Sequence, residues 1–313
     1  MSEIRTEKLL YKNFGECLRL SNDVAEAVVT LDFGPRVIRF AFVGGENFMY
    51  EDLDRTQMIG GEIMDAVYGK GSKWFSYGGH RMWMSPEDMP LSYYPDNESV
   101  AWSAIPNGVE LIAPPQKIND IQYKIELTLS KDKPRLTVKH YCTNLGPSTK
   151  RQAVWALTVL NNGGLEVVPQ PINDTGLLAN RVLSLWPYSD MSDERVYWGK
   201  KYVTLRQDPR IESAFKFGIN NIRGWAAYLN NGGMFIKKYT PNQNGVYPDF
   251  GTSFETYTNS HILEMETLGE LTAITPGSTA FHAEEWSLVD HVDRPEPDDE
   301  VTIDALVQLY IEQ

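Results

Sequence analysis

The chain has 313 residues, of which 42% are hydrophobic and 23% charged, and its formal net charge at pH 7 is −13. Phosphate binding needs a basic surface, so this charge argues against nucleic acid, and also against anionic lipid, as a partner. No apolar run approaches the roughly 18 residues that suggest a membrane span. The opening segment MSEIRTEKLL is charged and lacks the apolar stretch of a secretion signal. The two cysteines, Cys17 and Cys142, predict neither a disulfide framework nor a metal site. We therefore expect a soluble, cytoplasmic protein.

Short segments rich in Val, Ile, Thr and aromatic residues recur between clusters of Gly, Pro, Asn and Asp, which is typical of strands joined by turns. In chain order, these segments are residues 25–34, 36–45, 109–115, 123–144, 151–164, 224–240 and 278–290. Within residues 124–141, polar and apolar residues alternate on both sides of a polar turn, which predicts a β-hairpin. No internal repeat or change in composition divides the chain.

One amphipathic helix is expected, at the end of the chain in residues 298–313. Acidic residues precede its apolar stripe, and Asp298 or Asp299 could cap its first turn. The apolar stripe would consist of Ile303, Leu306, Val307 and Tyr310. The prediction is therefore an all-β protein with a short C-terminal helix, folded as a single domain over residues 1–313.

The stretch YGGHRMWMSPED, Tyr77–Asp88, concentrates polar and aromatic groups. Pro86 and the two adjacent glycines argue against a helix interior or a central strand, so we expect a loop. His80 titrates near neutrality, and Arg81 offers a planar fork of donors that suits hydroxyl or carboxylate oxygens. Flat apolar faces come from Trp74, Tyr77 and Trp83. This mixture matches a pyranose, which has hydroxyl edges and apolar C–H faces. Alternatively, Arg81 pairs with an acid of the same loop and the tryptophans fill core.

A second group of polar residues lies in the segment 261–268, which is expected to be a strand. Glu264 and Glu266 then share one face with apolar neighbours, because side chains alternate along a strand. A carboxylate held among apolar and aromatic groups has a raised proton affinity and can act as a general base or acid. The alternative is a solvated strand face.

Taken together, these segments resemble the galactose mutarotase-like superfamily, which includes the aldose 1-epimerases. The resemblance rests on the order and spacing of DFGPRVIRFAFVGGENFMYE, YGGHRMWMSPE, YPDFGTSFETYTN, HILEMETLGELTAITPGS and EEWSL. It covers nearly the whole chain, from Tyr11 to Leu288. It implies an antiparallel β-supersandwich whose concave sheet cups a sugar, in agreement with the all-β prediction.

The resemblance also implies roles for individual residues. Aldose 1-epimerases carry their catalytic glutamate in a strand of the form Leu-Glu-x-Gln, so Glu264 corresponds to the base and Glu266 stands where they have glutamine. Arg81, with His80 beside it, corresponds to their sugar-binding arginine. In AVWALTVLNNGG, Trp155 occupies the place of the histidine that serves as their acid.

The tryptophan at this place leaves two possibilities open. Either His80 or His261 protonates the ring oxygen, or the chain binds a sugar without epimerising it. Anomer interconversion needs a carboxylate base and an acid with a pKa near 7, and neither a metal nor a cofactor. Further residues that would line the same cup are Tyr247, Asp249 and Glu255, next to Trp83 and Trp155.

Three functions compete at this point. The first is an enzyme that interconverts the anomers of a small-molecule carbohydrate, with Glu264 as base, His80 as acid and Arg81 as anchor. The second is a carbohydrate-binding protein without turnover, which Trp155 favours. The third is a glycoside hydrolase or lyase. Glu264 and Glu266 would lie about 6.6 Å apart along a strand, near the separation in inverting enzymes, but on the same side of a ligand. We rank this third function lowest.

Overall fold

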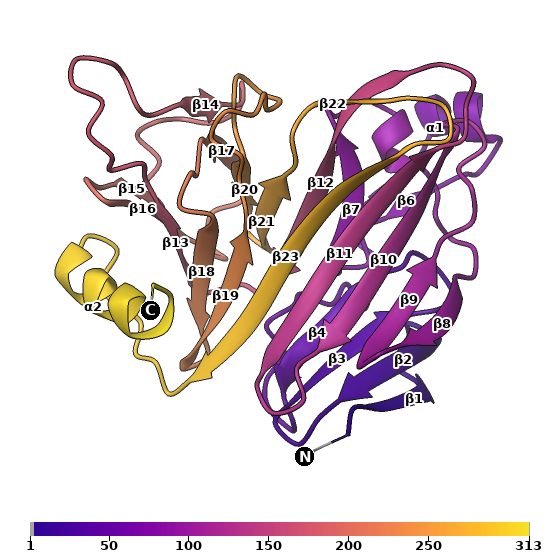
Figure 1. Cartoon of the computed structure of the whole chain (residues 1–313), viewed down its shortest axis with the longest axis horizontal. Helices are drawn as coiled ribbons and strands as arrows, with labels where there is room; N and C mark the ends of the chain where they lie inside the picture. The colour runs from indigo at the N-terminus through magenta and orange to yellow at the C-terminus, as the bar shows by residue number, and fades with distance from the viewer. Residues whose placement is uncertain (1–2, 313) are drawn as a thin grey trace.

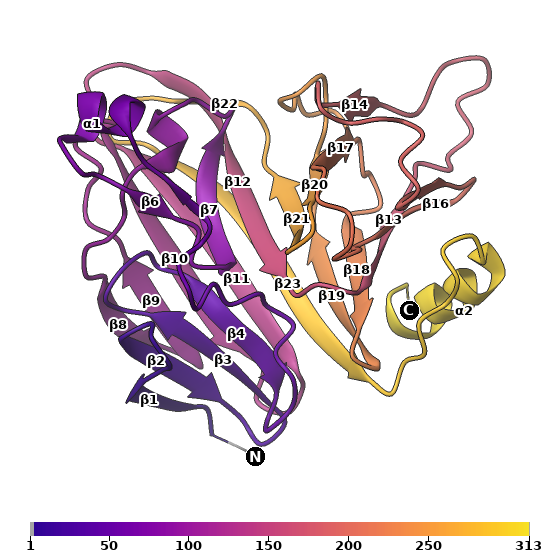
Figure 2. The ribbon, with the colours of Figure 1, turned by 180° about the vertical axis from the view of Figure 1, so that it is seen from behind.

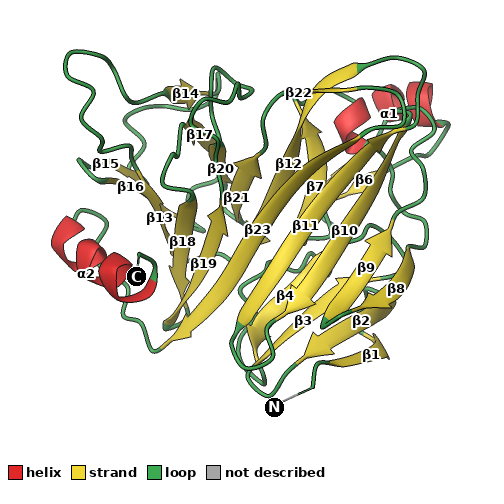
Figure 3. Cartoon of the chain, viewed as in Figure 1, coloured by secondary structure: helices red, strands yellow, loops and turns green. Residues whose placement is uncertain are grey.

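The computed structural model describes residues 3–312, and two large antiparallel sheets make up most of it. The first sheet has 11 strands and the second has 10, and they face each other as two layers (Figure 1). Seen from behind, β7, β12 and β21 of the first sheet lie in front of β10, β11 and β23 of the second (Figure 2). The predominance of strands confirms the all-β prediction (Figure 3).

The strands of the first sheet follow one another in a fixed order. In that order they are β1 (Arg5–Leu10), β2 (Glu16–Ser21), β3 (Ala25–Thr30), β4 (Val37–Phe42), β7 (Gly79–Ser85), β12 (Lys150–Leu160), β21 (Leu263–Leu268), β20 (Phe254–Thr258), β17 (Phe215–Ile219) and β14 (Leu183–Leu185), while β22 (Thr272–Ile274) pairs with β12. The centre of the sheet therefore joins segments that are far apart in the sequence.

The second sheet has its own order. It runs β15 (Val196–Trp198), β16 (Tyr202–Arg206), β13 (Leu165–Pro169), β18 (Trp225–Asn230), β19 (Gly233–Tyr239), β23 (Thr279–Asp290), β11 (Arg135–Asn144), β10 (Ile121–Leu129), β9 (Gly108–Ile112) and β8 (Ala101–Ile105). The predicted hairpin is confirmed as β10 and β11, which pair antiparallel. A two-stranded sheet, β5 (Met58–Ile59) and β6 (Trp74–Phe75), stands apart from both.

The main apolar core lies between the two sheets, because each strand turns alternate residues inward. In β10, Ile125, Leu127 and Leu129 belong to this core, whereas the intervening residues are only partly buried. Met82 and Met84 of β7 enter the same core from the first sheet. The residues of β7 that alternate with these methionines therefore point to the opposite face of the first sheet.

Helices are few. The C-terminal helix α2 (Glu300–Tyr310) is confirmed, and the Asp299 carboxylate caps it by accepting from the backbone N–H of Thr302 at 3.0 Å. Its buried residues Ile303 and Val307 pack on the outer face of the second sheet. The short elements α1 (Glu62–Tyr68) and η1 (Leu91–Tyr93) were not predicted. No helix within residues 3–312 combines the length and the apolar character that a membrane crossing requires.

The prediction of a loop at Tyr77–Asp88 is wrong for most of that stretch. Residues 79–85 form β7, a central strand between β4 and β12 in which every residue is buried. Glycine is needed where the chain enters the strand. Gly79 has φ 64°, and a Cβ there would lie 2.3 Å from the carbonyl oxygen of Val37. Pro86 follows the last residue of the strand. Because both faces are buried, the strand lacks the polar and apolar alternation by which strands are predicted.

Candidate functional site

The outer face of the first sheet carries a pocket of about 420 Å³. Alternation places Arg81 and Trp83 of β7, Trp155 of β12, and Glu264 and Glu266 of β21 along its floor. Other aromatic and polar groups that line it are Gln57, Trp74, Ser76, Glu87, Tyr93, Trp186, Tyr188, Lys216, Tyr257 and Asn259. Together with Trp74, six of the sequence-predicted site residues therefore meet in one pocket.

Arg81 and Glu264 form a buried ion pair at the floor of the pocket. Arg81 Nη1 donates to Glu264 Oε1 at 3.0 Å. The guanidinium lies 4.4 Å from the ring centre of Trp83 and 5.5 Å from that of Trp74, within the range of cation–π attraction. The pair thus holds the Glu264 carboxylate in a fixed place, with one of its oxygens already occupied.

Glu266 belongs to a second buried cluster of charges. Its Oε2 accepts from Trp155 Nε1 and from Lys216 Nζ, each at 2.8 Å. The same ammonium lies 2.9 Å from Glu255 Oε2, and Glu255 Oε1 accepts from the hydroxyl of Thr252 at 3.0 Å. Lys216 thus bridges two carboxylates and places Glu255 behind the pocket wall rather than in it.

The protonation of this cluster departs from that of free side chains. The pKa of Glu266 is raised to about 8. Burial is the largest cause; the charges of Glu255 and Glu264 act in the same direction, and Lys216 opposes them. Burial also disfavours the charged form of Lys216, but the attraction of its two carboxylate neighbours outweighs burial and raises the pKa of Lys216. Glu266 is therefore a carboxyl group that can hold a proton near neutral pH.

Some polar atoms in the pocket have no partner. Among the residues that the structure describes, the buried atoms Arg81 Nε, Trp74 Nε1 and Glu266 Oε1 make no hydrogen bond. A buried polar atom without a partner costs about 1–3 kcal/mol.

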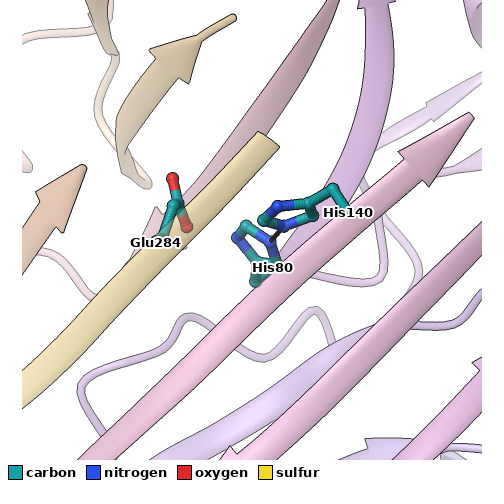
Figure 4. Close-up of side chains that lie close together, drawn as sticks. All are labelled: His80, His140 and Glu284. Carbon is teal, nitrogen blue, oxygen red and sulfur yellow. Dashed lines mark hydrogen bonds between the residues drawn. The ribbon is translucent and has the colours of Figure 1, made fainter. Parts of the chain in front are cut away.

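His80 lies on the opposite face of β7 and is completely buried between the sheets. Its Nδ1 is 2.8 Å from the hydroxyl of Thr158, and its Nε2 is 2.7 Å from Nε2 of His140 (Figure 4). His140 Nδ1 is 3.3 Å from the carbonyl of His282, which can only accept. That bond leaves His140 Nε2 to accept the proton of His80 Nε2. Burial lowers the pKa of His80 well below its usual value, so the ring is neutral. The predicted acid is therefore not in the pocket.

The same inter-sheet cluster contains the group that could hold a metal ion. Ligand atoms of His80, His140 and Glu284 lie within 4.8 Å of one another (Figure 4). The Glu284 carboxylate already accepts from Trp286 Nε1 at 2.8 Å and from the Thr267 hydroxyl, and Lys237 Nζ lies 2.9 Å away. These residues lie behind the strands of the pocket, and none of them lines it.

Four other candidates from the sequence do not line the pocket. Tyr77 stacks on Phe33 and donates to Asn97 at 2.6 Å. Tyr247 accepts from the backbone N–H of Asn242 at 2.7 Å. Asp249 is partly exposed in a turn; burial raises the pKa of Glu255, and the nearby charge of Asp249 adds to that shift. His261 is exposed.

Sequence reasoning missed Lys216 and the aromatic wall formed by Tyr93, Trp186, Tyr188 and Tyr257. Lys216 carries a readable signal, because it stands between Phe215 and Phe217, which point into the main core. A lysine in an otherwise apolar strand must face a polar partner. Trp186 and Tyr188 lie outside the strands, in the segment after β14, and carry no such signal.

The fold of this chain is similar to the folds of several solved structures. No family model and no curated protein sequence matches the chain. A proposed aldose 1-epimerase from Klebsiella pneumoniae matches 100% of this chain and 88% of its own, with a TM-score of 0.61 and 11% identity. A TPR-domain containing protein from Parabacteroides distasonis has a TM-score of 0.60 and 14% identity over 90% of this chain, which spans 49% of that protein. A galactose mutarotase-like protein from Lactobacillus casei has a TM-score of 0.53 and 10% identity, with coverages of 87% and 99%.

These structures show that the chain has the galactose mutarotase-like β-sandwich fold, which confirms the fold expected from the sequence resemblance.

Proposed function

We propose that the protein is a carbohydrate-active enzyme that interconverts the anomers of a small sugar in the pocket of the first sheet. The observation that supports this most is the buried Glu264 carboxylate, fixed by Arg81 at the floor of an aromatic-walled pocket. The solved structure of the proposed aldose 1-epimerase from Klebsiella pneumoniae shares the fold and agrees with this reaction class.

The walls of the pocket suit a sugar. Tryptophan and tyrosine rings have flat faces on which the C–H face of a pyranose can stack, and Trp83, Trp155 and Trp186 are among the residues that line the pocket. Arg81, Glu264 and Glu266 add polar groups to this lining. A site lined by apolar and aromatic groups with few polar atoms is typical of small-molecule binding.

The reaction begins with proton transfer to Glu264. The carboxylate accepts the proton of the C1 hydroxyl while an acid protonates the ring oxygen, and the ring opens to the aldehyde. Rotation about the C1–C2 bond and ring closure give the other anomer. Arg81 keeps Glu264 in place through this cycle. None of the histidines within residues 3–312 lines the pocket, so the acid has to be a different residue.

That absence favours a second candidate function, a carbohydrate-binding protein without turnover. Trp155 fills the place of the histidine expected from the resemblance and donates to Glu266 instead. Such a protein would bind the same sugars and leave the rate of anomer exchange unchanged.

The two candidates are separated by measuring binding and exchange on the same sugars. Calorimetry over a panel of aldoses identifies the ligand, and NMR magnetisation exchange between its α and β anomers gives the rate. The proposed enzyme accelerates exchange of the sugar that it binds. Binding with exchange at the uncatalysed rate would establish the binding protein and exclude the enzyme.

A further inference from the structure

We propose that Glu266 carries a proton on Oε1 and donates it to the ring oxygen of the sugar, in place of the histidine that the pocket lacks. The inference rests on the proposed function and names the acid that this function leaves open. Glu266 is 1% exposed, lines the pocket and has no hydrogen-bond partner at Oε1.

The count of buried charges requires a proton in this cluster. One buried ammonium, Lys216, faces the two buried carboxyl groups of Glu255 and Glu266. With both carboxyl groups ionised, one negative charge is unbalanced. An unpaired buried charge is expensive, and a carboxyl group at such a site binds a proton instead.

The hydrogen bonds place this proton on Glu266. Both oxygens of Glu255 face donors, from Thr252 and Lys216. Glu266 Oε2 also accepts two hydrogen bonds, from Lys216 and Trp155. Glu266 Oε1 is the oxygen without a donor. A proton there turns an unsatisfied acceptor into a donor on a residue that lines the pocket.

The position of Glu266 beside Glu264 suits anomer interconversion. The two residues are two apart on β21, which corresponds to about 6.6 Å along the strand. The hydroxyl oxygen and the ring oxygen of a pyranose are both bonded to C1, so both lie on the same edge of the sugar. Two carboxyl groups on one side of the ligand, which argue against a hydrolase, can therefore reach both reacting oxygens.

The proton transfers balance without any other reactant. Glu264 takes the proton of the C1 hydroxyl, a C1=O double bond forms, and the bond between C1 and the ring oxygen breaks. The electron pair of the broken bond stays on the ring oxygen, which takes the proton of Glu266. On closure at the other face of the aldehyde, the ring oxygen returns its proton to Glu266 and Glu264 gives its proton to the C1 oxygen, so both residues end as they began.

The environment of Glu266 gives the reaction a predicted pH dependence. Its pKa is raised to about 8 by burial. The groups that face it are Lys216, Glu264, Tyr188 and Tyr257 in the pocket, Glu255 behind its wall, and Lys237 and Glu166 between the sheets. Because the acid form is present below this pKa and is lost as the pH rises through it, the rate should fall above about pH 8.

The variant Glu266→Gln tests this role, with Glu285→Gln on the exposed part of β23 as the matched control. Glutamine cannot donate a carboxyl proton, so the catalysed rate should fall by roughly 10²–10⁴-fold and sugar binding should persist. Infrared difference spectra of the variant against the wild type should show the loss of one protonated carboxyl band at pH 7, a readout that does not depend on catalysis. The control should keep both the rate and the band.

Each result decides a different question. An active wild type with full activity in Glu266→Gln would overturn the role of Glu266 and leave the enzyme proposal standing. The absence of a protonated carboxyl group assigned to Glu266 would also overturn it. A wild type that binds sugar without exchange would overturn the proposed function, and with it the role of any acid.

Discussion

At the scale of single residues, Arg81 is the residue whose replacement should affect the ligand most directly. Its planar guanidinium lies against Trp83 and donates to Glu264, and its Nε is unpartnered. Lysine keeps the charge but cannot supply donors in this fork geometry. We expect Arg81→Lys to weaken sugar binding by about tenfold or more, which corresponds to about 1.4 kcal/mol. Calorimetry of a folded variant with unchanged affinity would remove Arg81 from the binding site.

The residues of the site could be predicted from sequence only in part. Arg81, Trp83, Trp155, Glu264 and Glu266 line the pocket as expected. His80 does not, because the sequence predicts a loop where the structure has strand β7, and neighbouring residues of a strand point to opposite faces.

Glu255 does not line the pocket for a different reason. Glu255 is close to the site but is screened from the pocket by its ion pair with Lys216, which lies 39 residues earlier in the chain. No local sequence pattern predicts an ion pair between residues so far apart in the chain.

At the scale of elements, β7 depends on a glycine at its entry. Gly79 has φ 64° and passes so close to Val37 that an added Cβ would lie 2.3 Å from its carbonyl oxygen. Gly163 has φ 85° with nothing within 4 Å, so an alanine there meets backbone strain alone. We expect Gly79→Ala to destabilise the fold by about 1–3 kcal/mol more than Gly163→Ala, as overpacking does. Urea unfolding of both variants measures the difference; equal losses would mean that the close approach is not a constraint.

Elements with one polar face could be predicted, and those without one could not. The β10–β11 hairpin and helix α2 show their exposed faces as a period in the sequence, so both were found. In β7 every residue is buried, and its glycines and proline pointed to a loop. The polar groups of this strand are paired with distant residues such as Thr158 and Glu264.

At the scale of the whole molecule, the two sheets share one apolar core, which includes residues from Leu18 to Leu288. A shared core predicts that residues 1–313 unfold as one unit. Thermal unfolding followed by near-UV and far-UV circular dichroism should give one transition at the same temperature. Two separate transitions would contradict the single domain predicted from the sequence.

The overall architecture could be predicted to the level of an all-β sandwich but not to the level of strand order. Pairings such as β7 with β12 and β12 with β21 join segments separated by many residues. They are set by how the two sheets bury their inner faces together, and no short segment encodes them.

The central claim is that the pocket interconverts sugar anomers with Glu264 as the base, and one paired measurement tests it most directly. Polarimetry of a freshly dissolved α-sugar that the protein binds gives the mutarotation rate with the wild type and with Glu264→Gln, while calorimetry gives both affinities. Glutamine keeps the shape of the side chain but cannot accept the proton. We predict an accelerated rate for the wild type and a loss of roughly 10²–10⁴-fold in the variant, with affinity retained. A wild-type rate equal to the uncatalysed rate, or an undiminished rate in the variant, would contradict the claim.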